Sequence, residues 1–272
     1  MNGKELAAAL RLAGPTYGTL ITSPSPRLPA ALADSGLDFV FIDTEHIALD
    51  RAELSWMCQT YQQLGMAPLV RIPEPNPNLA TMVLDGGAAG VIAPYVETAD
   101  QVRALVGAVK CRPLKGERLK RYLQGEALEP ELQTYIEQHN SQHSLVINVE
   151  STPAIAALDD MLAVKGLDAV LVGPHDLSCS LGIPEQYDHP RFDQAIQTII
   201  RKARACQIGA GIHFWGDVAQ EVDWLREGLN MLIHSADISL FVKQLRAELT
   251  HIQSELKPND KKRKPETQGM IA

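Results

Sequence analysis

The sequence predicts an α/β protein in which eight parallel strands and their helices close into one (β/α)₈ TIM barrel. Three observations predict it. Short runs that are apolar at consecutive positions recur along the chain, as in parallel strands buried on both faces. Amphipathic segments separate most of these runs, and a parallel crossover needs such a helix. The runs number eight, which suits a closed barrel. An open doubly wound sheet is the alternative.

The predicted strands are short, and the second shows their character best. Residues 39–46 read FVFIDTEH, so four apolar positions precede three ionisable side chains in four residues. Charge therefore appears only where a buried strand reaches the surface. In chain order the predicted strands are 18–23, 38–43, 67–72, 90–95, 144–150, 168–173, 209–214 and 230–235.

Helical patterns fill the intervals between the strands. Several of them close with glycine just before the next strand, as a left-handed helix C-cap requires. Residues 1–15 are expected to form an amphipathic helix rather than a signal peptide, because Glu5 and Arg11 interrupt a short apolar run. The other predicted helices are 27–36, 48–65, 78–88, 98–110, 152–166, 192–209 and 217–228.

Two segments depart from this alternation. Residues 111–143 form a long connection between the fourth and fifth strands, suited to a lid or a subunit contact. Residues 257–272 are polar and charged and are predicted to be a flexible tail. The expected organisation is thus a single barrel domain over residues 1–256, followed by that tail.

Composition excludes several classes of function. The 272 residues are 45% hydrophobic and 21% charged, so a large core is expected, and a net charge of -8 disfavours a nucleic-acid surface. The four cysteines lack disulfide or zinc-finger spacing, which indicates a reducing cytoplasm. No run of about eighteen apolar residues indicates a membrane span. No glycine-rich nucleotide-phosphate motif occurs.

The carboxyl ends of all eight strands open on one face of a barrel, where polar residues remote in sequence meet. No lysine lies at these ends, so a Schiff-base mechanism is disfavoured. The residues expected at this face are Asp43, Glu45, His46, Arg71, Glu150, Asp176, His213, His234 and Asp237.

Within this set, Glu150 and Asp176 follow neighbouring strands and make a hard oxygen site suited to Mg²⁺ or Mn²⁺. The alternative is that each pairs with an arginine or caps a helix. Arg71 is placed to grip a carboxylate or stabilise an oxyanion, or else to form a structural ion pair. His46 suits a general base, and Asp85 is either its orienting partner or an ordinary surface aspartate.

Several motifs resemble those of one family. The segments GLDFVFIDTEH, VRIPEPN, LDGGAAGVIAPYVETADQ, NVES and GLDAVLVGPHDLSCSLG are similar, in the same order, to those of the HpcH/HpaI aldolases. These are metal-dependent pyruvate aldolases related to the citrate lyase β subunit, and the resemblance covers residues 16–250. It implies a barrel of the phosphoenolpyruvate/pyruvate-domain type and a carbon–carbon lyase acting on a 2-oxo-4-hydroxy acid through a pyruvate enolate.

The resemblance also implies roles for individual residues. Glu150 and Asp176 would hold a divalent ion, with Mg²⁺, Mn²⁺ and Co²⁺ as candidates. His46 would be the acid/base, Asp85 its partner and Arg71 the clamp on the C2 oxygen. Substrate contacts would come from Asp43, Gly173, Pro174 and His175. The partners would be pyruvate or oxaloacetate, an aldehyde and further copies of the chain, in a homo-oligomer such as a hexamer with exchanged carboxyl-terminal helices.

Three departures from the family pattern point to a divergent substrate. Leu119 stands where a glycine is expected, Asn148 where a glutamine is common and His175 where a small residue is usual. Three alternatives stay open: a lyase that decarboxylates oxaloacetate, an acyl-CoA lyase of the same fold, and a non-catalytic oligomeric binding protein.

Overall fold

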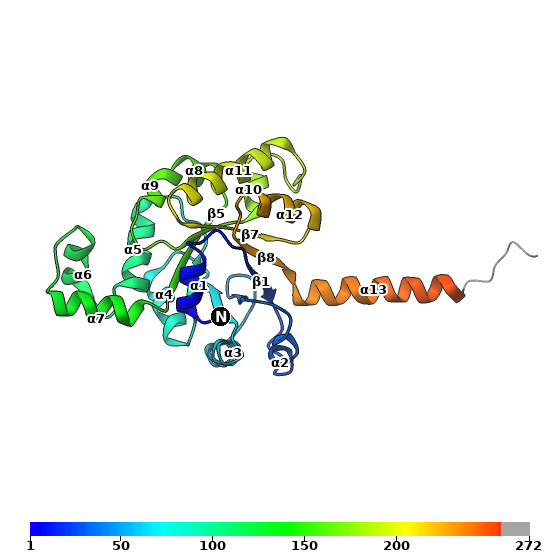
Figure 1. The fold of residues 1–272 in the computed structure, drawn as a ribbon, viewed down its shortest axis with the longest axis horizontal. Coiled ribbons are helices and arrows are strands. Elements are labelled where there is room, and N and C mark those ends of the chain that lie inside the picture. Colours follow the sequence, from blue (N-terminus) through cyan, green and yellow to red (C-terminus); the bar gives the residue numbers. More distant parts are fainter. Residues whose placement is uncertain (257–272) are drawn as a thin grey trace, which may run out of the picture. The chain divides into compact units, whose positions relative to one another are not determined.

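The computed structural model of the protein describes residues 1–256 and shows a closed barrel of eight parallel strands. Each strand pairs with the next in sequence, and β8 pairs with β1, which confirms the predicted barrel over an open sheet (Figure 1). The strands are β1 (Thr16–Ile21), β2 (Phe39–Asp43), β3 (Ala67–Arg71), β4 (Gly90–Ala93), β5 (Ser144–Val149), β6 (Ala169–Val172), β7 (Gly209–Phe214) and β8 (Met231–Ala236).

Helices surround the strands, and several begin at side-chain caps that the sequence encodes. Asp50 and Glu53 form a capping box at the start of α3, and Thr98 and Gln101 form another at α5. The helices are α1 (Gly3–Ala9), α2 (Leu28–Leu32), α3 (Arg51–Gln63), α4 (Pro77–Asp85), α5 (Ala99–Lys110), α6 (Gly116–Leu123), α7 (Pro130–Asn140), α8 (Thr152–Ala156), α9 (Leu158–Leu162), α10 (Pro174–Ser180), α11 (Pro190–Ala205), α12 (Val218–Arg226) and α13 (Asp237–Leu256).

The apolar core has two layers. Outward-facing strand residues pack against the helices, and a second cluster that includes Phe39, Phe41 and Leu69 fills the barrel interior. Leu6 and Leu10, in and just after α1, are fully buried in that interior cluster. A Cβ on Gly209, at the start of β7, would lie 3.2 Å from Leu10. The amino-terminal segment therefore closes the end of the barrel where the strands begin.

The long connection between α5 and β5 contains two helices, α6 and α7. They lie at one edge of the barrel beside α5 (Figure 1). None of the residues of α6 is buried, whereas α7 buries Ile136 and Asn140. The helical character expected of residues 111–143 is thus present, and a role as lid or subunit contact stays a prediction.

The chain divides into two compact units, Met1–Asp237, which holds the barrel, and Ile238–Ala272. The expected domain boundary at residue 256 stays a prediction, and the expected tail, residues 257–272, lies outside the described residues. Across residues 1–256, no helix has the length and apolar character needed to span a bilayer.

Candidate active site

Strand register brings a carboxylate and a guanidinium together at the mouth of the barrel. Asp43 ends β2 and lies beside Arg71, which ends β3. Arg71 donates from Nε to Asp43 Oδ1 at 2.8 Å and from its terminal nitrogen to Oδ2 at 2.6 Å. Asp43 is only 2% exposed. This two-pronged contact fixes the guanidinium plane, so Arg71 is held rigidly at the mouth.

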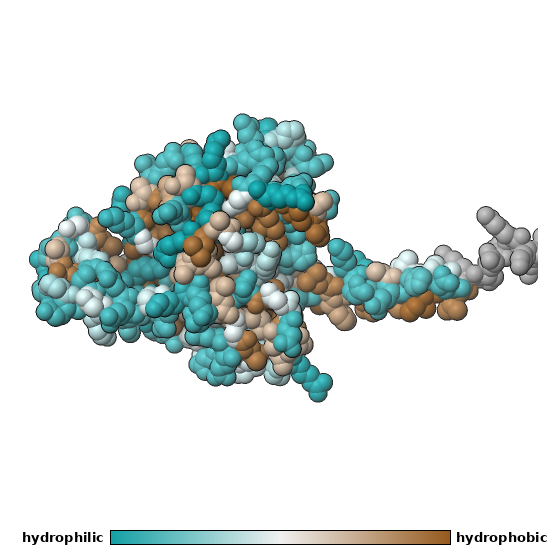
Figure 2. Space-filling view, in the orientation of Figure 1, coloured by the Kyte–Doolittle hydropathy of each residue, from teal (hydrophilic) through white to brown (hydrophobic). Residues whose placement is uncertain are grey.

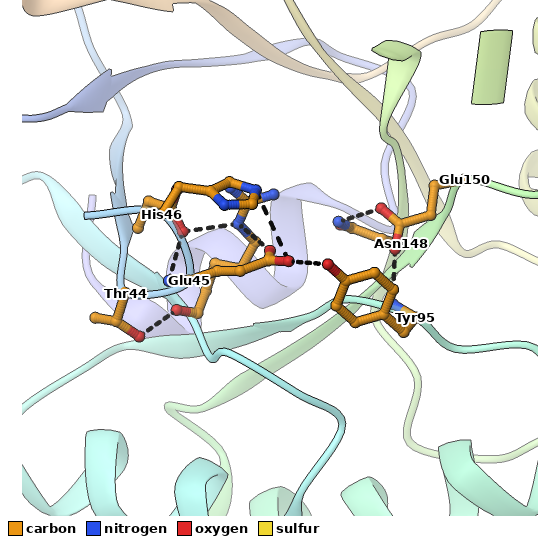
Figure 3. Close-up of polar contacts among 8 residues, drawn as sticks. Thr44, Glu45, His46, Tyr95, Asn148 and Glu150 are labelled. Carbon is orange, nitrogen blue, oxygen red and sulfur yellow. Dashed lines mark hydrogen bonds and ion pairs between the residues drawn. The ribbon is translucent and has the colours of Figure 1, made fainter. Parts of the chain in front are cut away.

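Glu45 joins this pair to two further residues. Its Oε2 lies 3.1 Å from Arg71 Nε, and its Oε1 accepts a 2.5 Å hydrogen bond from the Tyr95 hydroxyl. Its Oε1 also lies 3.8 Å from Nε2 of His46, whose side chain is 64% exposed. Figure 3 shows the Glu45 carboxylate between the His46 ring and the Tyr95 phenol. The predicted general base thus has a carboxylate neighbour, and that neighbour is Glu45.

Glu150 follows β5 and is 7% exposed. The backbone N–H of Tyr95 donates to its Oε1 at 2.7 Å, and the amide of Asn148 donates to its Oε2 at 2.9 Å (Figure 3). A Cβ placed on Gly173 would come within 2.8 Å of Oε2. A glycine at position 173 is therefore needed for the carboxylate to lie where it does.

Burial and charge shift the ionisation of these groups in opposite directions. Burial raises the pKa of Glu150, and the charges of Asp176 and Glu45 add to the rise, against the hydrogen bonds from Tyr95 and Asn148. Burial also acts to raise the pKa of Asp43, but the hydrogen bond and charge of Arg71 outweigh it and hold that pKa below its usual range. Within residues 1–256 Glu150 forms no ion pair of its own, although the charge of Arg71 acts on it.

The segment after β6 supplies the remaining predicted contacts. Pro174 is buried in the first turn of α10, and Asp176 lies exposed in the same turn. The charge of Asp176 acts on both Glu150 and Tyr95, so the two expected metal carboxylates interact electrostatically. His175 is exposed, and its Nδ1 lies 3.7 Å from Glu185 Oε1.

The donor set fits a divalent cation in part. Four carboxylates, those of Asp43, Glu45, Glu150 and Asp176, act electrostatically on one another or on the single guanidinium of Arg71. The buried Oδ1 of Asn148 accepts no hydrogen bond. Within residues 1–256 no three His, Cys, Asp or Glu side chains form a complete ligand set. Two protein carboxylates with water and substrate oxygens as further ligands suit Mg²⁺ or Mn²⁺.

Asp85 lies apart from this constellation. It is the last residue of α4, its side chain is largely exposed, and it forms an ion pair with Arg112. The described part of a single chain shows no hydrogen bond or ion pair between Asp85 and His46. Its role as partner of His46 stays a prediction.

Two other histidines at the mouth make structural hydrogen bonds. His213 Nε2 lies 3.1 Å from the Ser235 carbonyl, and burial lowers the pKa of His213 to about 4, so the ring is neutral at pH 7 and donates. His234 Nδ1 lies 2.9 Å from the Glu221 carboxylate. Trp215 is exposed and packs edge-on against His213.

Two residues at the site were not among the predicted site residues. Tyr95 follows β4 and contacts both Glu45 and Glu150, and Asn148 holds Glu150 from two positions earlier on β5. The alternation of side chains along a strand places residues 148 and 150 on one face, and that spacing was the available signal for Asn148. Tyr95 depends on a backbone conformation that no sequence pattern marked.

Comparisons with known proteins show one family likeness over most of the chain. Residues 17–243 match the family model described as HpcH/HpaI aldolase/citrate lyase. The chain is 32% identical over 238 residues to a 2-keto-3-deoxy-L-rhamnonate aldolase of Klebsiella pneumoniae subsp. pneumoniae, an alignment that covers 88% of this chain and 89% of the relative. An Escherichia coli O157:H7 protein of the same name is also 32% identical, with 87% and 88% covered.

Solved structures show the same likeness. An HpcH/HpaI aldolase from Desulfitobacterium hafniense DCB-2 superimposes with a TM-score of 0.78 at 26% identity, covering 92% of this chain and 95% of that chain. The citrate synthase SbnG gives a TM-score of 0.78 at 28% identity, with 92% and 98% covered. The similarity thus spans the whole barrel and its mouth.

Proposed function

The chain belongs to the HpcH/HpaI aldolase/citrate lyase family, and from that premise we propose that the mouth of its barrel cleaves and forms 2-oxo-4-hydroxy acids through a pyruvate enolate. The protein is an aldolase, a carbon–carbon lyase, as its curated relatives are. The 2-keto-3-deoxy-L-rhamnonate of those relatives is the first substrate to test. The other product would be pyruvate, together with an aldehyde.

One observation carries the proposal. Buried Glu150 forms no ion pair within residues 1–256, and the charge of Arg71, fixed by Asp43, acts on it. An enolate places new negative charge on the C2 oxygen of pyruvate. A guanidinium whose donors are already oriented stabilises such charge without reorganisation. The mouth therefore combines a cation site with a fixed positive group.

The chain's own residues supply the other steps. His46, exposed at the mouth with Glu45 beside it, would accept the proton of the C4 hydroxyl as the C3–C4 bond breaks. Arg71 would face the C2 oxygen as charge collects there. The backbone of Gly173, Pro174 and His175, at the start of α10, would lie against the substrate carboxylate. Asp43 would act by holding Arg71 in place.

The family's metal dependence fits these residues. Glu150 and Asp176 would hold the ion, and a divalent cation there would act as a Lewis acid for the C2 carbonyl and as a template for the 2-oxo acid. We propose Mg²⁺ or Mn²⁺, with Co²⁺ as a substitute, because the ligands are hard oxygens.

A second activity of the same site deserves testing. The structural likeness to a citrate synthase at 28% identity shows the same barrel used for carbon–carbon bond formation in that protein, and for this chain the second candidate starts from oxaloacetate in place of pyruvate. Loss of CO₂ from oxaloacetate would also generate the enolate, with the same groups stabilising it. The acyl-CoA and non-catalytic alternatives have no comparable support in the described residues.

The decisive experiment follows the methyl protons of pyruvate in D₂O by NMR, with the Mg²⁺ or Mn²⁺ form of the full chain. We expect deuterium exchange that stops on metal removal and in Glu150→Ala. Asp160→Ala, which removes a carboxylate from α9 outside the site, is the matched control and retains exchange. Exchange that persists in the metal-free protein would contradict the proposal.

The proposal also covers the oligomeric state of the chain and its location in the cell. We propose that the chain acts as a homo-oligomer, possible stoichiometries including the hexamer, in which apolar residues of α13 contribute to the interface. The last helix has no buried residue of its own. We also propose a cytoplasmic location, because free cysteines such as the exposed Cys179 and Cys206 persist in a reducing compartment.

A further inference from the structure

Tyr95 stands out because its backbone is in an unfavourable conformation and its two hydrogen-bond donors, the backbone N–H and the phenol, each contact a carboxylate of the site. Its φ is 55°, in the left-handed region that non-glycine residues rarely occupy. Such outliers gather at active sites, where the surrounding structure holds them in place. Two hydrogen bonds hold Tyr95 in this conformation: its backbone N–H donates to Glu150, and its hydroxyl donates to Glu45.

The two contacts have separable consequences. The backbone donor fixes Glu150 whatever side chain stands at position 95. The phenol donor fixes Oε1 of Glu45, the oxygen that lies 3.8 Å from His46 Nε2. The other oxygen, Oε2, is buried and accepts no hydrogen bond, since Arg71 Nε directs its hydrogen to Asp43 and only its charge faces Glu45. The Tyr95 hydroxyl is therefore the side-chain hydrogen-bond donor that orients the Glu45 carboxylate.

We propose that Tyr95 is a positioning residue for carbon–carbon bond cleavage: its phenol holds Glu45, and Glu45 in turn orients the His46 imidazole toward the substrate hydroxyl. This rests on the proposed function, in which His46 is the base. Figure 3 shows the chain of contacts, with Tyr95 and His46 on opposite sides of Glu45. The Tyr95 side chain is also 53% exposed, so it is open to solvent.

The test is Tyr95→Phe, which keeps the ring and the backbone donor and removes the phenol. Steady-state cleavage of 2-keto-3-deoxy-L-rhamnonate is the assay, with Mn²⁺ affinity measured by titration. We expect kcat to fall about tenfold, with KM and the Mn²⁺ dissociation constant each within about twofold of the wild type. Tyr135→Phe is the matched control, because Tyr135 is equally exposed at 53%, lies on α7 and donates no hydroxyl hydrogen bond within residues 1–256.

A double-mutant cycle with Glu45→Ala shows whether Tyr95 acts through Glu45. If it does, adding Tyr95→Phe to Glu45→Ala lowers kcat no further, whereas independent effects would multiply. Tyr95→Asn is a second probe, because asparagine tolerates the left-handed conformation and keeps the N–H on Glu150. It should lose kcat as the phenylalanine variant does and still bind Mn²⁺.

The outcomes separate this inference from the proposed function. A wild-type protein that exchanges pyruvate protons and cleaves the substrate, with Tyr95→Phe unaltered in kcat, overturns the role of Tyr95 alone. A rise in KM without a fall in kcat for Tyr95→Phe would also overturn that role, because the ring would then only contact the substrate. Effects of Tyr95→Phe and Glu45→Ala on kcat that multiply fully would overturn it as well. A wild-type protein that shows neither exchange nor cleavage overturns both.

Discussion

At the scale of single residues, Gly173 leaves room for the Glu150 side chain because it has no Cβ. Its φ of -89° is open to any residue, so backbone strain does not require glycine here. The constraint is contact, since a Cβ would lie 2.8 Å from Glu150 Oε2 and 3.1 Å from Glu150 Cβ. Gly173→Ala should therefore displace the Glu150 carboxylate and weaken divalent-metal binding by roughly 10- to 100-fold, as loss of supporting contacts at metal sites does.

Mn²⁺ titration of the variant checks this prediction. Gly14→Ala is the control, because a Cβ there meets nothing within 4 Å. Unchanged Mn²⁺ affinity in Gly173→Ala would show that Glu150 is not a metal ligand or that the segment moves freely.

Replacing Arg71 should change how the stability of the protein depends on pH. In the native protein Asp43 has a lowered pKa, so its ionised form contributes stability above the unfolded-state value near 4, and this is lost as pH falls through the folded value. Arg71→Met removes the group that lowers this pKa and leaves burial, which raises it. We expect a loss of about 3 to 5 kcal/mol in the free energy of unfolding at pH 7, and a smaller loss near pH 4.

Urea unfolding at the two pH values measures both quantities. Asp43→Asn in the Arg71→Met background removes the stranded charge, so it should recover part of the stability at pH 7. A loss that is equal at both pH values would assign the effect to packing instead of charge.

The sequence predicted the location of several polar side chains better than it predicted their contacts, and their roles stay predictions. Asp43, His46, Arg71 and Glu150 were expected at the mouth because each follows or ends a barrel strand, and topology alone brings such positions together. The structure places them there. The pairing of Arg71 with Asp43 depends on strand register, and the reach of Tyr95 depends on a left-handed φ. Neither the strand register nor the left-handed φ can be predicted from a single sequence.

At the scale of elements, the strands were predictable because burial on both faces leaves a continuous apolar signature. Each of the eight lies within two residues of the expected bounds. Helices were less sharply defined: the segment 152–166 was expected as one helix and forms two, α8 and α9, with Ala157 between them. Short amphipathic helices end where local hydrogen bonds and packing permit, and residue periodicity fixes such ends poorly.

The amino-terminal helix gives a prediction at this scale. Leu10, just after α1, is fully buried among the side chains of the barrel interior. Leu10→Ala should lower the free energy of unfolding by about 2 to 5 kcal/mol, through lost apolar burial and a cavity. Because α1 closes the end of the barrel away from the mouth, kcat at a temperature where the variant is folded should equal that of the wild type.

Urea unfolding and steady-state kinetics test this pair of expectations together. Leu12→Ala is the control, because Leu12 is 65% exposed and its loss should change stability by less than about 0.5 kcal/mol. A fall in kcat for the folded Leu10→Ala protein would indicate coupling between the two ends of the barrel.

At the scale of the whole molecule, closure of the barrel brings the carboxyl ends of all eight strands together at one site. The sequence predicted closure from the number of strands, and the pairing of β8 with β1 confirms it. The assembly of several chains is different, because its contacts leave no trace in the strand pattern. The structure adds an exposed apolar stripe on the last helix, which was not predicted from the sequence.

The stripe on α13 consists of Phe241, Leu245, Leu249 and Ile252, spaced three or four residues apart and all exposed. Figure 2 shows apolar residues gathered along one side of this helix. A helix with such a face is stable when the face is covered, and the proposed oligomer would cover it. Phe241→Glu with Leu249→Glu should therefore lower the mass measured by light scattering after size exclusion. Thr250→Glu with Ser254→Glu, which adds the same charge on the opposite, exposed face of the helix, should leave that mass unchanged. An unaltered mass in the charged variant would place the interface elsewhere on the chain.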